Sequence, residues 1–170
     1  MGQVREVEHH RRRIVATFQR ASGVVGNGAD EIRSDYARFL CILVSGWIEK
    51  SVASIVLAYA EGKCPRPLQS HLESSLKRLT NVTAERLLST MGSLDMGWRE
   101  QLASGLSDEQ TSALNSIVGL RNDIAHGGGG SLSLAGVTGY WNAAQAAVEQ
   151  FETLLLAPVR PSAARKRTRR

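Results

Sequence analysis

"EIRSDYARFLCILVSGWIEKSVASIVLAYAE", residues 31–61, is the longest helical pattern in the chain. Apolar side chains recur in it at spacings of three and four residues, which places them on one side of a helix. The members of this stripe are Tyr36, Leu40, Leu43, Val44 and Trp47. Residues 39–44 are apolar on every side, which predicts burial on more than one side. This helix is therefore expected to lie in the core of the fold.

The rest of the chain also has helical patterns separated by short breaks. Residues 22–30 form a glycine-rich connection, in which Asp30 is a candidate N-cap. In "SDEQ", Ser107 stands three residues before Gln110, which is the spacing of a capping box. Further helices are predicted at 4–21, 68–79, 84–95, 96–106, 107–126 and 134–156. In the last helix the buried stripe is predicted to be Trp141, Ala144, Val148, Phe151 and Leu155. No strand alternation of useful length is present, so the fold class is predicted to be all-α.

Length and composition restrict the class of protein. The 170 residues suit one domain with extensions, and 42% hydrophobic and 22% charged residues are typical of a globular protein. No continuous apolar run reaches the roughly 18 residues of a membrane helix, so no membrane partner is expected. The charged N-terminus does not resemble a secretory signal, and the two cysteines fit a reducing compartment. We therefore expect a cytoplasmic protein without a disulfide framework or a metal cluster.

The positive charge is concentrated at the C-terminal end. Residues 157–170 contain six of the 21 Lys and Arg residues and no acid, which leaves 15 basic and 16 acidic residues elsewhere. This composition predicts a disordered tail that attracts RNA phosphates without sequence preference, or a solubilising end. The expected RNA-binding residues are Arg165, Lys166, Arg167, Arg169 and Arg170. The expected divisions are a basic N-terminal helix and linker (1–28), a helical-bundle domain (29–157) and the tail (158–170).

The segment "GLRNDIAHGGGG" (119–130) ends a helical pattern with an arginine, a histidine and four glycines. An Arg and a His separated by four residues also occur at Arg5/His10 and Arg66/His71, so the spacing alone is weak evidence. Only Arg121 and His126 end a capped amphipathic helix. One interpretation is that both side chains complement the helix dipole, with Gly127 as the C′ residue. The other is that they form a catalytic site.

"LRNDIAHG" (120–127) resembles the signature of HEPN domains, and "YARFLCILVSGWIEKSV" (36–52) resembles the long core helix of their RiboL-PSP-HEPN branch. The resemblance covers about residues 30–157. It implies an antiparallel helical bundle that dimerises and cuts RNA without a metal, often in toxin–antitoxin or anti-phage systems. One departure concerns the branch that is paired with a nucleotidyltransferase antitoxin. That branch has a tyrosine two residues after the His, where this chain has Gly128, which argues against that particular antitoxin.

The residue types suit this chemistry on their own. Cleaving RNA without a metal requires a base for the 2′-hydroxyl, an acid for the leaving oxygen and positive charge on the phosphate. Histidine titrates near neutrality and suits the first two roles, and the planar fork of arginine suits the third. Asn122 precedes His126 by four residues, so it could fix the imidazole tautomer or bind a phosphate oxygen.

Glu49 is a further candidate, because a carboxylate among small and apolar helical neighbours needs a partner. It is predicted either to orient Arg121 or to be an ordinary surface glutamate. Five residues of helix separate Arg121 and His126 by roughly 140° and about 7.5 Å, so the two side chains do not lie on one face of the helix. One Arg and one His also give a single chain only one titratable group for two proton transfers. A homodimer that shares the site would supply two.

The sequence thus predicts a metal-independent endoribonuclease that needs no cofactor. RNA and an antitoxin or another defence-system protein are its expected partners. The alternatives are a non-catalytic HEPN-type module that binds RNA, nucleotide or protein, and a helical adaptor.

Overall fold

The computed structural model of the chain describes residues 2–25, 28–128 and 132–156. Within these residues every regular element is an α-helix, and no strand is present. The predicted all-α class is confirmed. The helices are α1 (Gly2–Ser22), α2 (Ala29–Ala60), α3 (Arg66–Leu76), α4 (Ala84–Gly92), α5 (Met96–Gly105), α6 (Asp108–Ala125) and α7 (Leu134–Leu156). The basic tail, including all five of its predicted RNA-binding residues, lies outside the described residues.

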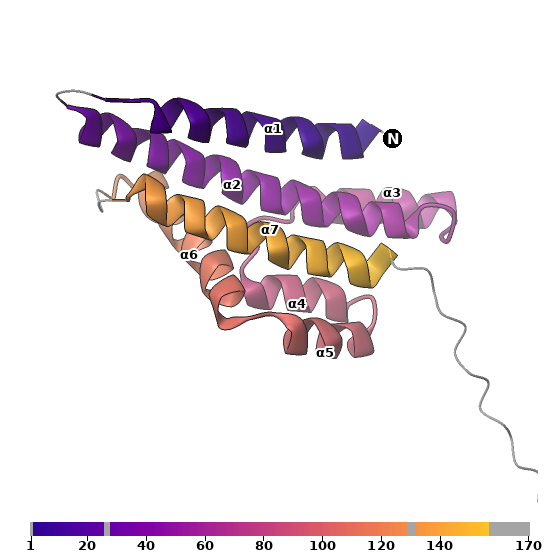
Figure 1. Cartoon of the computed structure of the whole chain (residues 1–170). Helices are drawn as coiled ribbons and strands as arrows, with labels where there is room; N and C mark the ends of the chain where they lie inside the picture. The colour runs from indigo at the N-terminus through magenta and orange to yellow at the C-terminus, as the bar shows by residue number, and fades with distance from the viewer. Residues whose placement is uncertain (1, 26–27, 129–131, 157–170) are drawn as a thin grey trace, which may run out of the picture.

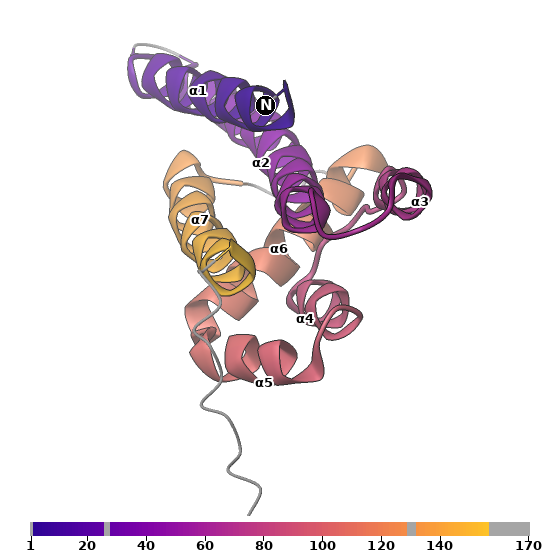
Figure 2. The ribbon, with the colours of Figure 1, turned by 90° about the vertical axis from the view of Figure 1, so that its right-hand side faces the viewer.

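The long helices α1, α2 and α7 lie side by side (Figures 1 and 2). α1 runs antiparallel to α2, whereas α7 runs in the same direction as α2 (Figure 1). α6 packs against both α2 and α7, and the short helices α4 and α5 lie at the other side of α6 and α7. The core forms where these helices meet. An edge-to-face contact joins Trp47 of α2 to Trp141 of α7, with ring centroids 4.8 Å apart.

Burial along α2 follows part of the predicted pattern. Leu40, Val44 and Trp47 are buried, but Phe39 is 41% exposed and Ile42 is 44% exposed. Residues 39–44 are thus buried at Leu40, Cys41 and Val44, where α2 packs against neighbouring helices, but the side that carries Phe39 and Ile42 is left uncovered. α2 is also long and apolar enough to cross a membrane, although 56% of its most apolar window is buried inside the bundle. A core helix of a helical bundle passes the same test of length and composition.

The helix ends follow local chemistry. Ser107 Oγ accepts a hydrogen bond from the Gln110 backbone N–H, and Gln110 Oε1 accepts one from the Ser107 N–H. The predicted capping box at the start of α6 is thus confirmed. Asp30, in contrast, is not the N-cap of α2. That position belongs to Gly28, whose φ of 76° is one that glycine adopts without steric cost. The five residues of the predicted stripe in α7 are all buried.

Candidate active site

α6 carries the side chain of Arg121 to the edge of the core. Ala113, Leu114, Ile117 and Val118 are its buried apolar residues, and Arg121 lies one heptad after Leu114. Residues seven apart share one side of a helix. Arg121 therefore continues the core-facing side of α6 at the point where the core ends, and its side chain is partly buried.

Two amide oxygens hold the Arg121 guanidinium. Its Nη1 donates to Asn122 Oδ1 at 3.2 Å and to Asn81 Oδ1 at 3.5 Å. No ion pair joins Arg121 to a carboxylate within the described part of the chain. Among the described residues its positive charge is therefore positioned but not neutralised, and most of its five N–H donors find no acceptor there.

Asn81 links Arg121 to Glu49. The Asn81 backbone N–H donates to Glu49 Oε1 at 2.8 Å, and its side chain accepts from Arg121. Asn81 also has a φ of 53°, a left-handed conformation that Asn tolerates better than most residues. Glu49 thus reaches Arg121 through Asn81 and not through the direct pairing considered from the sequence. We name Glu49, Asn81, Arg121 and Asn122 the Arg121 cluster.

Sequence reasoning did not identify Asn81. It lies in the "TNVT" break (80–83), far in sequence from both of its partners. An Asn within a short loop was the only available signal, because Asn is frequent at left-handed positions. Nothing in the sequence indicates which helices such a loop contacts.

His126 lies at the end of α6, beyond the Arg121 cluster. It is the C-cap residue, with φ −93° and ψ 12°, and its side chain is exposed. Among the described residues, the imidazole has no hydrogen-bond partner. The predicted contact with Asn122 is absent, because Asn122 Oδ1 accepts from Arg121 instead. His126 is therefore accessible to a ligand from solvent.

The end of α6 is capped by the backbone alone. The Gly128 N–H donates to Asp123 O at 2.7 Å and the Gly127 N–H donates to Ile124 O at 3.1 Å, which is the Schellman pattern. Gly127 has the left-handed φ of 76° that this motif requires, as expected for the C′ residue. Neither the Arg121 guanidinium nor the His126 imidazole serves as a cap. The end of α6 is therefore capped without either side chain.

Gly128 has no space for a side chain in this conformation. A Cβ atom there would lie 2.8 Å from Asp123 O and 3.3 Å from the Asp123 Cβ. A tyrosine at this position would require the helix end to rearrange. The departure from the tyrosine-bearing branch thus has a structural counterpart in the cap of α6.

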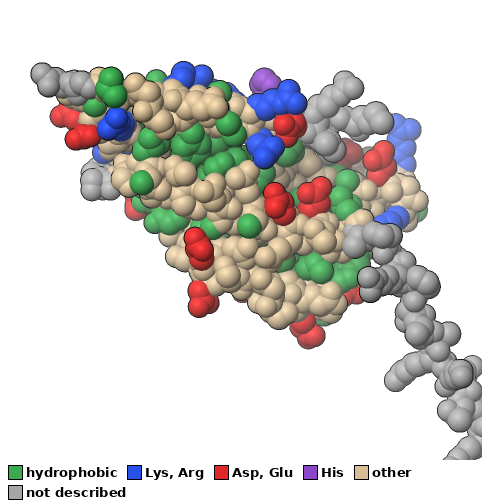
Figure 3. Space-filling model, in the orientation of Figure 1, with side chains coloured by type: hydrophobic (Ala, Val, Ile, Leu, Met, Phe, Trp, Pro, Cys, Tyr) green, Lys and Arg blue, Asp and Glu red, His purple; other side chains and the backbone are tan. Residues whose placement is uncertain are grey.

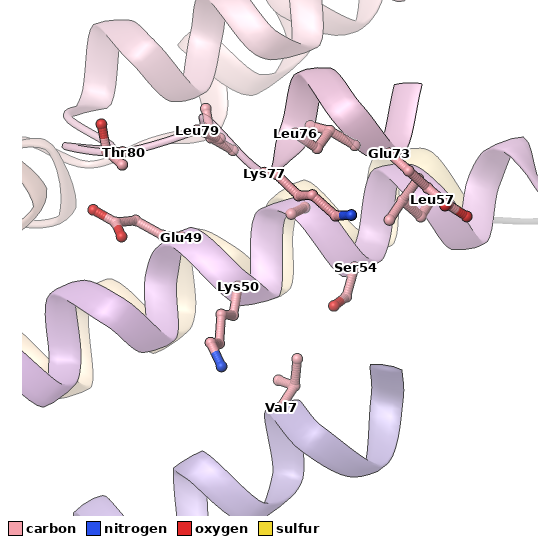
Figure 4. A pocket seen from close by; sticks show the side chains of 11 residues that line it. Val7, Glu49, Lys50, Ser54, Leu57, Glu73, Leu76, Lys77, Leu79 and Thr80 are labelled. Carbon is pink, nitrogen blue, oxygen red and sulfur yellow. The ribbon is translucent and has the colours of Figure 1, made fainter. Parts of the chain in front are cut away.

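A cavity of about 360 Å³ adjoins the Arg121 cluster between α1, α2 and α3 (Figure 4). Glu49 lines it and extends from α2 toward Thr80, next to Asn81 in the chain (Figure 4). Lys50 and Lys77 supply positive charge to its wall, and Ala53, Leu57, Leu76 and Leu79 supply apolar surface. A group bound at Arg121 could therefore extend into this cavity past Glu49.

The remaining histidines lie outside the cluster. His9 and His71 are exposed, and His10 Nε2 lies 3.3 Å from Lys50 Nζ. Within the described part of the chain, no group of three or more His, Cys, Asp or Glu side chains could hold a metal ion. The chemistry available at the Arg121 cluster is thus that of a guanidinium, amides, a carboxylate and a nearby imidazole.

Comparison with known proteins supports one assignment. The RiboL-PSP-HEPN family model matches residues 7–157, which is most of the chain and includes much of α1. No curated protein and no solved structure matches the chain. The matched region contains the whole Arg121 cluster and His126. HEPN membership indicates a nuclease or an RNA-binding helical module. The helical bundle and the match over residues 7–157 together show that the chain belongs to the RiboL-PSP-HEPN family.

Proposed function

We propose that this protein is a metal-independent endoribonuclease that uses Arg121 and His126 to cleave RNA. The observation that carries the proposal is that the backbone caps α6 without using either side chain. Arg121 is held by neutral amides with its charge uncompensated, and His126 is exposed beyond it. A phosphate is the ligand that best matches a positioned guanidinium with unused donors.

The proposed reaction begins when Arg121 binds the non-bridging oxygens of a phosphodiester. His126 takes the proton of the 2′-hydroxyl, whose oxygen attacks phosphorus as the bond to the 5′-oxygen breaks. A protonated imidazole gives its proton to the leaving 5′-oxygen. The products are a 2′,3′-cyclic phosphate and a 5′-hydroxyl. Asn122 and Asn81 keep the guanidinium in position, and Glu49 holds the backbone of Asn81.

Two imidazoles are needed for the two proton transfers, and a homodimer supplies both. The uncovered side of α2 offers an apolar surface to a second copy, with Ile32, Phe39 and Ile42 exposed. Ile42 lies seven residues before Glu49 and therefore on the same side of the helix. A two-fold contact over Ile42 would place two Arg121 clusters near one interface, with His126 of the partner subunit as the second proton carrier.

The proposed biological role is that of a toxin in a toxin–antitoxin or anti-phage system, acting on RNA in the cytoplasm. A second protein would then bind and restrain the nuclease. The uncompensated guanidinium of Arg121 gives such an antitoxin a cationic site, which it would block with an anionic group that mimics the phosphate of RNA.

Cleavage of a labelled RNA in the presence of EDTA tests the proposed chemistry, with DNA of the same sequence as the matched substrate. We expect RNA fragments ending in a 2′,3′-cyclic phosphate, and intact DNA because it lacks the attacking hydroxyl. Loss of cleavage in EDTA, or equal cleavage of DNA, would contradict the scheme. RNA binding without cleavage would instead favour the non-catalytic HEPN module.

A further inference from the structure

The cavity between α1, α2 and α3 has the size and lining of a small-ligand site. Its volume of about 360 Å³ lies within the range of roughly 300–1,000 Å³ that such sites occupy. Its apolar wall consists of Val7, Ala53, Leu57, Leu76 and Leu79. Glu49 and Thr80 lie at one end of it, and Leu57 and Glu73 lie at the other (Figure 4). Because Thr80 precedes Asn81 in the chain, the end with Glu49 is the one next to the Arg121 cluster.

The charged side chains that line this cavity balance one another. Glu49 and Glu73 supply two negative charges, and Lys50 and Lys77 supply two positive charges. A phosphate gains little from a lining without net charge, whereas an uncharged flat ring with polar edges can use both the apolar wall and the charged groups. A nucleobase is a ring of this kind. The phosphate of the same nucleotide is better placed at Arg121, whose charge is not neutralised within the described residues.

Two of the lining groups can distinguish one base from another. The ionised Glu49 carboxylate only accepts hydrogen bonds, and Asn81 N–H uses one lone pair of its Oε1, so both oxygens can still accept. The Lys77 ammonium at the end of α3 only donates, and it has no ion pair in the part of the chain that the structure describes. Lys50, in contrast, contacts His10 of α1, with Nζ 3.3 Å from Nε2.

Guanine is the base that best matches this carboxylate and ammonium. Its Watson–Crick edge has two adjacent donors, N1–H and the 2-amino group, and its O6 and N7 accept hydrogen bonds. Adenine and cytosine have a ring acceptor beside their amino group, and uracil has one donor between two acceptors, so each offers a carboxylate at most one good hydrogen bond. In a duplex the Watson–Crick edge is already paired. The matching ligand is therefore an unpaired guanine, as found in single-stranded RNA.

Charge outside the cavity favours one path for the rest of the strand. Val7 places α1 at the edge of the cavity, and Lys and Arg side chains gather along α1, whereas acidic side chains lie over α7 (Figure 3). Arg11 and Arg12 of α1 have 50% and 78% of their side-chain surface exposed. Neighbouring phosphates are therefore attracted to α1 and repelled by α7.

We propose that this cavity binds a guanine base of single-stranded RNA beside the phosphate held by Arg121. Glu49 accepts from N1–H and the 2-amino group, Lys77 donates to O6 or N7, and the apolar wall contacts the ring. The inference rests on the proposed function for its substrate class, RNA, and adds a preference for cleavage next to guanine. Binding of the base requires no proton transfer, so it can be measured apart from cleavage.

Uncleavable RNA provides the direct test. The probe is a short fluorescein-labelled 2′-fluoro RNA with one guanine among uracils, which lacks the attacking hydroxyl, and its binding is followed by fluorescence anisotropy. Matched RNAs carry adenine, or inosine, which lacks only the 2-amino group of guanosine. We expect the guanine RNA to bind about tenfold more tightly than either, as for loss of a hydrogen bond to a charged group. Equal affinities would overturn the proposal. A guanine preference without cleavage of ordinary RNA would support this site and refute the nuclease.

Substitutions at the two polar groups identify what reads the base. Glu49→Gln keeps an oxygen for Asn81 N–H but loses the second acceptor, so it should bind the guanine and inosine RNAs equally. Lys77→Met should weaken binding of the guanine RNA about fivefold, as for loss of one hydrogen bond. The matched control Arg78→Met removes the same charge from an exposed neighbour that does not line the cavity, and should have a smaller effect. A guanine preference retained in Glu49→Gln, or equal losses in Lys77→Met and Arg78→Met, would contradict the proposal.

Filling the cavity tests where the base binds. Ala53→Leu adds a larger side chain to the cavity wall, whereas Ala58→Leu makes the same change on α2 outside this cavity. With both variants verified as helical, we expect only Ala53→Leu to lose the preference for guanine over inosine. A preference unchanged in Ala53→Leu, or lost equally in both variants, would place the base elsewhere and overturn the proposal.

Discussion

Two substitutions of Asn81 should distinguish its contribution to stability from its contribution to RNA cleavage. Its side chain accepts from Arg121 Nη1, while its left-handed backbone directs the N–H to Glu49. Asn81→Gly removes the first contact only, because glycine adopts a φ of 53° without a steric penalty. Asn81→Ala removes the same contact and keeps a Cβ in the left-handed region without the short polar side chain that lets Asn tolerate it, a conformation that costs an alanine roughly 1–2 kcal/mol.

The magnitudes follow from the hydrogen bonds. The contact with Arg121 is long at 3.5 Å, and the guanidinium keeps its bond to Asn122, so we expect a loss of about 1 kcal/mol in positioning. This corresponds to roughly a fivefold lower kcat/KM for RNA in both variants. The free energy of unfolding should change by less than about 1 kcal/mol in Asn81→Gly, but should fall by roughly 1–2 kcal/mol in Asn81→Ala.

Urea unfolding and single-turnover cleavage of a labelled RNA measure the two effects separately. We expect the two variants to lose the same fraction of cleavage activity, and Asn81→Ala to lose more free energy of unfolding than Asn81→Gly. Full cleavage by Asn81→Gly would refute the role of Asn81 in positioning Arg121. Equal stability of the two variants would show that the left-handed conformation is not maintained.

Three further predictions concern other parts of the chain. Gly128→Ala should lower the free energy of unfolding by about 1–3 kcal/mol in urea, because its Cβ would lie 2.8 Å from Asp123 O; unchanged stability would contradict the cap geometry. Burial raises the pKa of the Cys41 thiol to about 11, so an aromatic disulfide reagent at pH 8 should modify Cys64 rapidly and Cys41 only after unfolding. Two fast-reacting thiols would show that Cys41 is accessible. Removing residues 162–170 deletes five cations and should reduce the salt slope of RNA binding by up to about 3.5, whereas an unchanged slope would assign binding to the folded body.

Local sequence determined the helices because their signals are short-range. Capping of α6 by Ser107 and Gln110 depends on residues three apart, and the buried side of α7 follows from its 3.6-residue period. The exposure of Phe39 and Ile42 could not be predicted in this way. It depends on which sides of α2 the other helices cover, and apolar residues on an uncovered side have the same local pattern as core residues.

Part of the candidate site could likewise be predicted from local sequence, and part could not. Arg121 and His126 stand out in the sequence because a run of four glycines follows them at the end of one helix. The contact of Glu49 cannot be recognised in the sequence, because its partner Asn81 is 32 residues away. Glu49 also binds the backbone N–H of Asn81, a group that almost any residue would carry. Such a contact leaves no periodicity in the sequence, so only the fold reveals it.

The central claim is that Arg121 and His126 cleave RNA. The chain offers a matched control in Arg66 and His71, which have the same spacing on α3 and are exposed. The decisive measurement compares cleavage of one labelled RNA in EDTA by the wild-type protein, by His126→Ala and by His71→Ala, each verified as helical. We predict that cleavage is lost in His126→Ala and retained in His71→Ala. Cleavage by His126→Ala at the rate of the wild-type protein would contradict the claim that His126 is catalytic.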